Sequence, residues 1–124
     1  MKHLISWASI PSSDFDRAVN FYSAVTGKSL EVKGEGDQRM ATSLAESDFK
    51  ENIVGFGVTA DPTITPGPSG PRLYLAIEDM EGFLGRVDEA GGKIITPKSA
   101  MGEMGFWGLI EDSEGNQIGL HSTK

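Results

Sequence analysis

Residues Gly105 to His121, which read GFWGLIEDSEGNQIGLH, decide how this chain folds. Two apolar runs, Phe106 to Ile110 and Gln117 to Leu120, flank a polar cluster from Asp112 to Asn116. A turn-rich tract between two strand-like runs is the usual signal of a β-hairpin. We therefore predict a hairpin here, and the rest of the chain can be read as two modules, the second of which ends in it.

The composition bounds the class of protein. A chain of 124 residues with 38% apolar and 23% charged residues fits one globular domain, residues 1–124. The net charge of −7 argues against nucleic acid or an anionic membrane as the main partner. There is no cysteine, no apolar run long enough to span a bilayer, and no secretory pattern near Met1. We expect a cytoplasmic protein.

The first module is expected to run from residue 3 to residue 60. Residues 11–14, PSSD, supply a turn and a helix cap. An apolar stripe starts at Phe15 and recurs every three or four residues, and Gly27 ends the helix. Strands are expected on both sides of that helix. They are His3–Ile10, Leu30–Val32, Met40–Leu44 and Asn52–Thr59.

Residues 61–71, DPTITPGPSGP, contain four of the six prolines and two glycines, so we read them as a linker. A second module, residues 72–122, then repeats the pattern of the first. It is expected to contain a strand over Leu73–Ile77, a helix over Met80–Val87, a strand over Lys93–Thr96, and the hairpin.

The two modules superimpose at a constant offset of 65 residues. Asp14 falls on Asp79 and Gly27 on Gly92, and the apolar positions between them keep the same phase. Coincidence between two amphipathic helices that both end in glycine is the alternative. The pattern favours an internal βαβββ repeat.

Two tracts resemble the glyoxalase/bleomycin-resistance/dioxygenase superfamily, also called vicinal oxygen chelate proteins. They are D-F-D-R-A-x-x-F-Y, which starts at Asp14, and D-x-x-G-N-x-I-x-L, which starts at Asp112. The resemblance covers nearly the whole chain. It implies an α+β fold in which two paired βαβββ modules form an open curved sheet around a cavity, and it implies a homodimer.

In metal-dependent members of that superfamily, the first and last strands of each module supply four ligands to a divalent ion. The corresponding positions here are Trp7, Arg72, Gly119, and some residue of the segment 53–59, IVGFGVT. None of these is a good ligand, because indole and guanidinium do not coordinate metals and glycine has no side chain. We expect no metal cofactor, and a divalent metal remains the alternative.

His121 is the candidate for proton transfer. It lies two residues beyond Gly119, so strand alternation places it on the face shared by Gly119 and Gln117, which is expected to line the cavity. An imidazole titrates near neutral pH and suits a general acid or base. The alternative is a histidine at the end of a strand that is hydrogen-bonded to backbone or water. His3, near the N-terminus, is read as a solvated residue.

The candidate ligand-binding residues are Trp7, Arg72, Tyr74, Trp107 and Gln117. Trp7 can stack on a ligand or fill the space of the metal, and Arg72 can hold an anion or lie in solvent. Tyr74 can donate its hydroxyl or pack in the sheet. Because Phe106 and Trp107 alternate, only one of them faces the cavity, and the sequence does not say which.

The loop of residues 99–105, SAMGEMG, has the glycines of a mobile lid. Its residues Met101 and Met104 fit either a pliable cavity wall or the core.

Two functions follow from these residues and the resemblance. The first is a metal-free protein that binds a small organic molecule, aromatic or anionic, in its cavity. The second is a lyase or isomerase of the glyoxalase type, with His121 as base or with a divalent metal.

Overall fold

The computed structural model describes residues 4–51 and 53–124. The elements of the first module are β1 (Trp7–Pro11), α1 (Phe15–Thr26), β2 (Glu31–Lys33), β3 (Met40–Thr42), α2 (Glu46–Lys50) and β4 (Gly55–Thr59). Those of the second are β5 (Tyr74–Ala76), α3 (Met80–Val87), β6 (Lys93–Ala100), β7 (Phe106–Glu111) and β8 (Gln117–Ser122). Single 3₁₀ turns lie at Gly36–Gln38 and Gly102–Met104.

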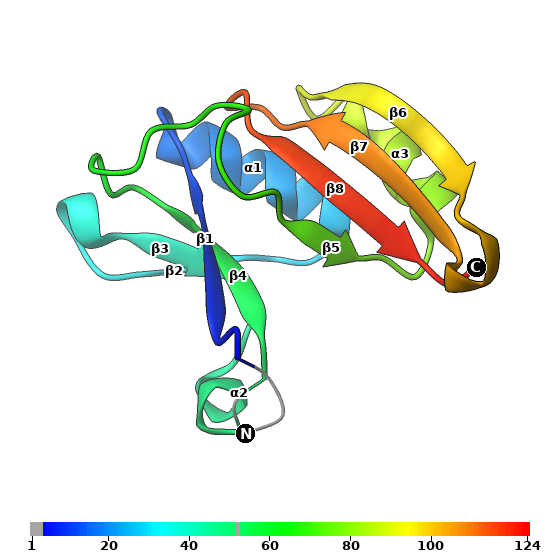
Figure 1. The fold of residues 1–124 in the computed structure, drawn as a ribbon. Coiled ribbons are helices and arrows are strands. Elements are labelled where there is room, and N and C mark those ends of the chain that lie inside the picture. The colour runs from blue at the N-terminus through cyan, green and yellow to red at the C-terminus, as the bar shows by residue number, and fades with distance from the viewer. Residues whose placement is uncertain (1–3, 52) are drawn as a thin grey trace.

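Each module forms its own four-stranded sheet, and the two sheets have the same topology (Figure 1). The strand orders are β1-β4-β3-β2 and β5-β8-β7-β6. In each sheet the first strand pairs in parallel with the last, and the other pairs are antiparallel. The predicted α+β fold of paired βαβββ modules is confirmed, with the strands in two separate sheets.

The ends of the long helices are set by local chemistry. The Asp14 carboxylate accepts a hydrogen bond from the Arg17 N–H at the start of α1, and Gly27 ends that helix with a φ of 69°. Asp79 caps α3 in the same way, through the N–H of Gly82. Both predicted helices are therefore observed, and each is capped by an aspartate.

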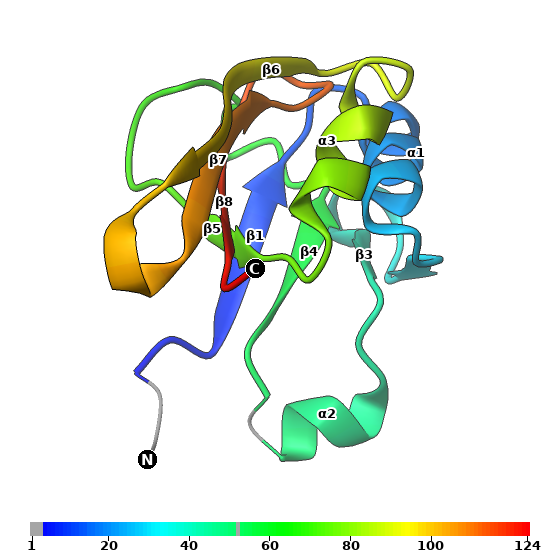
Figure 2. The same cartoon turned by 90° about the vertical axis from the view of Figure 1, so that its right-hand side faces the viewer.

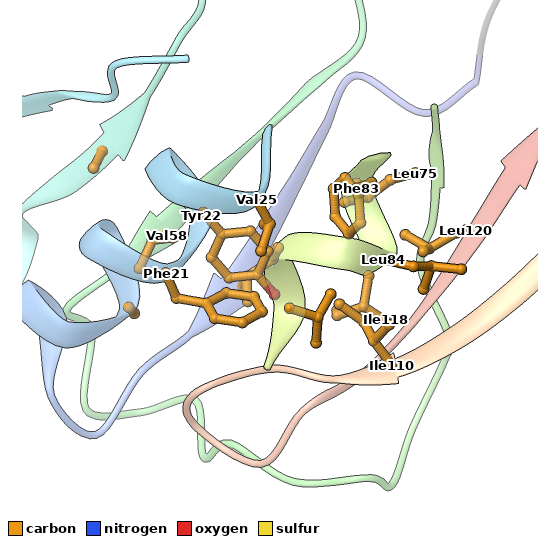
Figure 3. Close-up of a cluster of buried hydrophobic side chains, with 14 of the residues drawn as sticks. Phe21, Tyr22, Val25, Val58, Leu75, Phe83, Leu84, Ile110, Ile118 and Leu120 are labelled. Atoms are coloured by element: carbon orange, nitrogen blue, oxygen red, sulfur yellow. The ribbon is translucent and has the colours of Figure 1, made fainter. Parts of the chain in front are cut away.

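One hydrophobic core is shared by both modules. Helices α1 and α3 lie side by side (Figure 2), and each presents its apolar stripe to the cluster. Figure 3 shows Phe21 and Tyr22 of α1 in the same cluster as Ile110 and Leu120 of the second sheet. Each Å² of buried apolar surface stabilises the fold by about 25 cal/mol, so this shared core holds the two modules together.

The turn between β7 and β8 ties the second module to β1 and α1 of the first. The Tyr22 hydroxyl donates to Asp112 Oδ2 over 2.6 Å, and Asn116 Nδ2 donates to the carbonyl oxygen of Pro11 over 2.9 Å. Asp112 is only 2% exposed. The D-x-x-G-N tract is thus a structural joint between the modules.

Several predicted strand boundaries are wrong. β1 begins at Trp7 rather than His3, because its partner β4 begins at Gly55 and a strand needs a paired neighbour. The short helix α2 was missed. β6 runs four residues past Thr96 as an edge strand with two register shifts, the second of which spans Pro97. His3 and Asn52 lie outside the described residues.

Candidate functional site

One face of the second sheet carries most of the candidate residues. Along β8, Ile118 and Leu120 point into the core, so Gly119 and His121 lie on the opposite face. His121 pairs directly with Trp107 on β7 and with Ala76 on β5. Residues that are paired across a sheet share a face, so Trp107 and His121 lie on the same side.

The choice between the two aromatic residues of β7 is therefore settled. Trp107 lies on the open face, whereas Phe106 packs against the core with the Lys98 ammonium 4.4 Å from its ring centre.

A pocket of about 570 Å³ opens on this face. The polar groups among its lining side chains are the Tyr74 hydroxyl, the Trp107 indole N–H and the His121 imidazole, and the other side chains are apolar. The lining residues are Tyr74, Ala76, Met101, Met104, Trp107 and His121. Its size and apolar walls are typical of small-molecule sites.

The ring of Tyr74 lies directly over Gly119. A Cβ atom at Gly119 would stand 2.3 Å from Tyr74 Cδ2, which is closer than nonbonded carbon atoms approach. Glycine at this position is therefore what allows the ring to lie against the sheet. Tyr74 is 50% exposed, so its outer face is open to the pocket side.

The first module repeats this arrangement. Ser9 pairs with Gly57 as Tyr74 pairs with Gly119, and the offset of 65 residues maps Ser9 onto Tyr74. A Cβ atom at Gly57 would stand 2.6 Å from Trp7 Cζ2. In each module, an aromatic ring from the first strand therefore covers a glycine of the last strand: Trp7 covers Gly57, and Tyr74 covers Gly119.

The His121 ring contacts the loop between β6 and β7. Its Nε2 atom lies 2.7 Å from the carbonyl oxygen of Met104. This is the hydrogen-bonded arrangement that the sequence left open as the alternative to proton transfer.

Two predicted ligand-binding residues pair with each other instead of lining the pocket. Arg72 Nη2 donates to Gln117 Oε1 over 2.9 Å, at an exposed position beside the start of β5. Trp7 belongs to the other sheet and is not among the residues that line this pocket.

Met101 and Met104 belong to the pocket wall, one of the two places that the sequence left open for them. Both line the pocket, because residues 101–105 turn back toward β8. The available signal was two methionines within a loop interrupted by glycines.

A divalent metal does not fit the positions that the resemblance implies. Trp7, Arg72 and Gly119 carry no metal-binding side-chain atom, and the Tyr74 ring fills the space over Gly119. Within the segment 53–59, Gly57 has no side chain, and the Trp7 ring and the Met40 side chain lie against it. Within residues 4–51 and 53–124, no three His, Asp or Glu side chains stand close enough to share an ion.

A second cleft, of about 740 Å³, lies between the modules. Ile5 and Val54 line it from the first module, and Leu73 and Tyr74 from the second. Charged side chains, among them Lys28 and Glu78, also belong to its wall.

Comparison with known proteins places the chain in one family. Residues 4–120 match the model of the Glyoxalase/Bleomycin resistance protein/Dioxygenase superfamily. A glyoxylase-like domain-containing protein of Didymella fabae is 28% identical over 90% of this chain and 88% of its own length. Mycobacterium bovis CFP32, a candidate glyoxylase, is 26% identical over 93% of this chain. The chain spans 44% of the length of that relative.

Solved structures share the fold. TnmS3, an antibiotic binding protein from Streptomyces sp. CB03234, superimposes with a TM-score of 0.69 at 24% identity, over 100% of this chain and 98% of TnmS3. A glyoxalase/bleomycin resistance protein from Albidiferax ferrireducens gives 0.70 at 18% identity, over 97% and 98% of the two chains. Within the described part of the chain, no helix is long and apolar enough to cross a bilayer.

Proposed function

Because the chain belongs to the Glyoxalase/Bleomycin resistance protein/Dioxygenase superfamily, we propose that it binds a small organic molecule without a metal ion. The proposed site is the pocket lined by Tyr74, Trp107 and His121. The observation that carries this proposal is the Tyr74 ring over Gly119, which is one of the positions where the family resemblance implies a metal ligand.

The chemistry of the pocket supports binding. Trp107 and Tyr74 offer flat aromatic surfaces, and Met101 and Met104 offer flexible thioethers that adapt to irregular ligands. The antibiotic-binding neighbour TnmS3 has the same fold, which supports a binding role for this chain as well.

We also propose a homodimer. Four apolar side chains beside the paired ends of β1 and β4 are exposed: Leu4 (92%), Ile5 (63%), Ile53 (43%) and Val54 (41%). Two of them, Ile5 and Val54, line the cleft between the modules. Both β1 and β5 lie at the edges of their sheets. An exposed apolar group beside open strand edges favours association with a second copy.

The binding proposal has a test with two readouts. Protein purified in metal-free buffers should contain well under one Ni, Zn, Mn or Fe per chain by elemental analysis. The uncharged dye Nile red should bind with a rise in its fluorescence, and Trp107→Leu should weaken that binding about tenfold because a stacking surface is lost.

The control is Ile95→Ala, which alters an exposed apolar residue on β6 outside the pocket. It should leave dye binding unchanged. A stoichiometric, tightly held metal, or equal dye affinity in the Trp107→Leu and wild-type proteins, would contradict the proposal.

A further inference from the structure

Residues 101–105, here called the methionine flap, form a closed turn at one side of the pocket. The Met101 N–H donates to the carbonyl oxygen of Gly105 over 2.9 Å, so the two ends of the flap are joined. Gly102 and Gly105 have positive φ angles of 65° and 101°, which favour glycine. The flap is thus a small unit whose shape is set by its own backbone.

The flap lies against the end of β8. A Cβ atom at Gly105 would stand 2.2 Å from the carbonyl oxygen of Ser122, so only glycine permits this close contact. The second attachment is the hydrogen bond between His121 Nε2 and the carbonyl oxygen of Met104, over 2.7 Å. Together these contacts keep Met101 and Met104 at the pocket.

This hydrogen bond determines which ring nitrogen of His121 carries the hydrogen. A carbonyl oxygen only accepts hydrogen bonds, so Nε2 must carry the hydrogen. A nitrogen that carries its hydrogen has no lone pair with which to take a proton from a ligand. In this arrangement His121 Nε2 donates to the flap and is not available as a base, and only Nδ1 keeps a lone pair.

The pocket also lacks a partner for a charged ligand. Its described lining contains no Asp, Glu, Lys or Arg side chain. Arg72, the charged residue that the sequence offered for an anionic ligand, is hydrogen-bonded to Gln117 and is not part of the lining. A charged ligand that moves from water into this pocket would lose hydration, and no oppositely charged side chain of the lining would compensate for that loss.

We propose that the pocket takes an uncharged, planar aromatic ligand beneath the methionine flap, and that His121 is the positioning residue of the flap. This inference rests on the proposed binding function. The ligand would stack on Trp107 or Tyr74, and the thioethers of Met101 and Met104 would cover its edges.

The ligand class is tested with three naphthalene probes of equal size. They are 1-naphthylmethanol, which is uncharged, 1-naphthoate, which is an anion, and 1-naphthylmethylammonium, which is a cation. Titration calorimetry at pH 7.5 should show the uncharged probe binding at least about tenfold more tightly than either ion.

An ion that binds as tightly as 1-naphthylmethanol would overturn the ligand class while leaving small-molecule binding intact. If none of the three probes binds and Nile red does not bind either, the proposed function itself fails.

The role of His121 is tested without any ligand, by hydrogen exchange of the flap amides in the full chain. In His121→Leu the Met104 carbonyl loses its donor, so the amides of Met104 and Gly105 should exchange about fivefold faster. In His121→Gln the side-chain amide can still donate, so exchange should stay near the wild-type rate. Thermal melting of both variants checks that each is folded.

Equal exchange in the wild-type and His121→Leu proteins would overturn the positioning role. Equally fast exchange in His121→Leu and His121→Gln would overturn it too, because the role depends on a donor at this position.

Discussion

Tyr22 shows how a single hydroxyl joins the two modules. The residue is fully buried, and its hydroxyl donates to Asp112 Oδ2, which also accepts from Asn116 Nδ2. Burial, and then the charge of Asp112, raise the pKa of Tyr22 well above its usual value. Tyr22 therefore remains a neutral donor throughout the physiological pH range.

Replacing Tyr22 with Phe removes this donor and leaves the buried carboxylate with one fewer partner. We expect Tyr22→Phe to lower the free energy of unfolding by about 2 kcal/mol, as for a hydrogen bond to a charged group. Urea denaturation followed by fluorescence measures this. The control is Tyr74→Phe at the half-exposed pocket tyrosine, which should change stability by less than about 0.5 kcal/mol. Equal stabilities of the two variants would contradict the assigned role.

At the scale of the element, helix α1 receives part of its N-terminal capping from the other module. Glu114, in the turn between β7 and β8, accepts hydrogen bonds from the backbone N–H groups of Ser13 and Asp14 at 2.9 and 2.8 Å. Its other oxygen accepts from Arg17 Nε over 2.7 Å. A carboxylate at a helix N-terminus also interacts favourably with the helix dipole.

These contacts predict a specific pH dependence. Burial by itself raises the pKa of Glu114, but the hydrogen bonds from Arg17, Asp14, Ser113 and Ser13 outweigh it and lower the pKa from 4.5 to about 2. A carboxyl whose pKa is lower in the folded state binds protons less readily there than in the unfolded chain. Its contribution to stability is therefore complete above about pH 4.5 and is lost as the pH falls toward 2.

Glu114→Gln removes this titration, so the variant should lose less stability than wild type between pH 4.5 and pH 2, and should be less stable at pH 7. Melting temperatures measured across that range test the expectation. Glu31→Gln, on the exposed strand β2, is the control and should follow the wild-type curve. Parallel pH curves for wild type and Glu114→Gln would contradict it.

At the scale of the whole molecule, the helices of both modules pack together and leave one face of each sheet open. The N-terminal ends of β1 and β4 extend away from this shared core, toward α2 (Figure 1). The exposed apolar side chains lie at those ends. This arrangement gives the proposed homodimer a defined place to form.

The dimer prediction is a mass of about twice 13.3 kDa in solution. Light scattering across micromolar concentrations measures it. Ile5→Asp should shift the protein toward monomers, because it places a charge in the apolar group. Glu31→Gln again serves as a control that should not change the mass. A monomer mass for the wild-type protein at every concentration would refute the dimer.

Much of the architecture could be predicted because it depends on local chemistry. Asp14 and Asp79 cap helices through groups only three residues away, and glycines end α1 and shape the final hairpin turn. The apolar phase of each helix and the internal repeat are also readable along the chain. These features follow from residues that are close in sequence, and the structure contains them.

The strand boundaries and the placement of the candidate site residues were decided by contacts between residues that are distant in sequence. The start of β1 depends on where β4 begins, and the placement of Trp107 on the open face depends on its pairing with His121. Whether Arg72 meets a ligand or Gln117 depends on a contact between residues 45 positions apart. The sequence alone determined the repeat, the helices and the absence of metal-binding side chains at the implied positions. Only the tertiary structure determined that aromatic rings lie over Gly57 and Gly119 and that the His121 ring is hydrogen-bonded to the loop before β7, because both depend on long-range packing that local sequence does not specify.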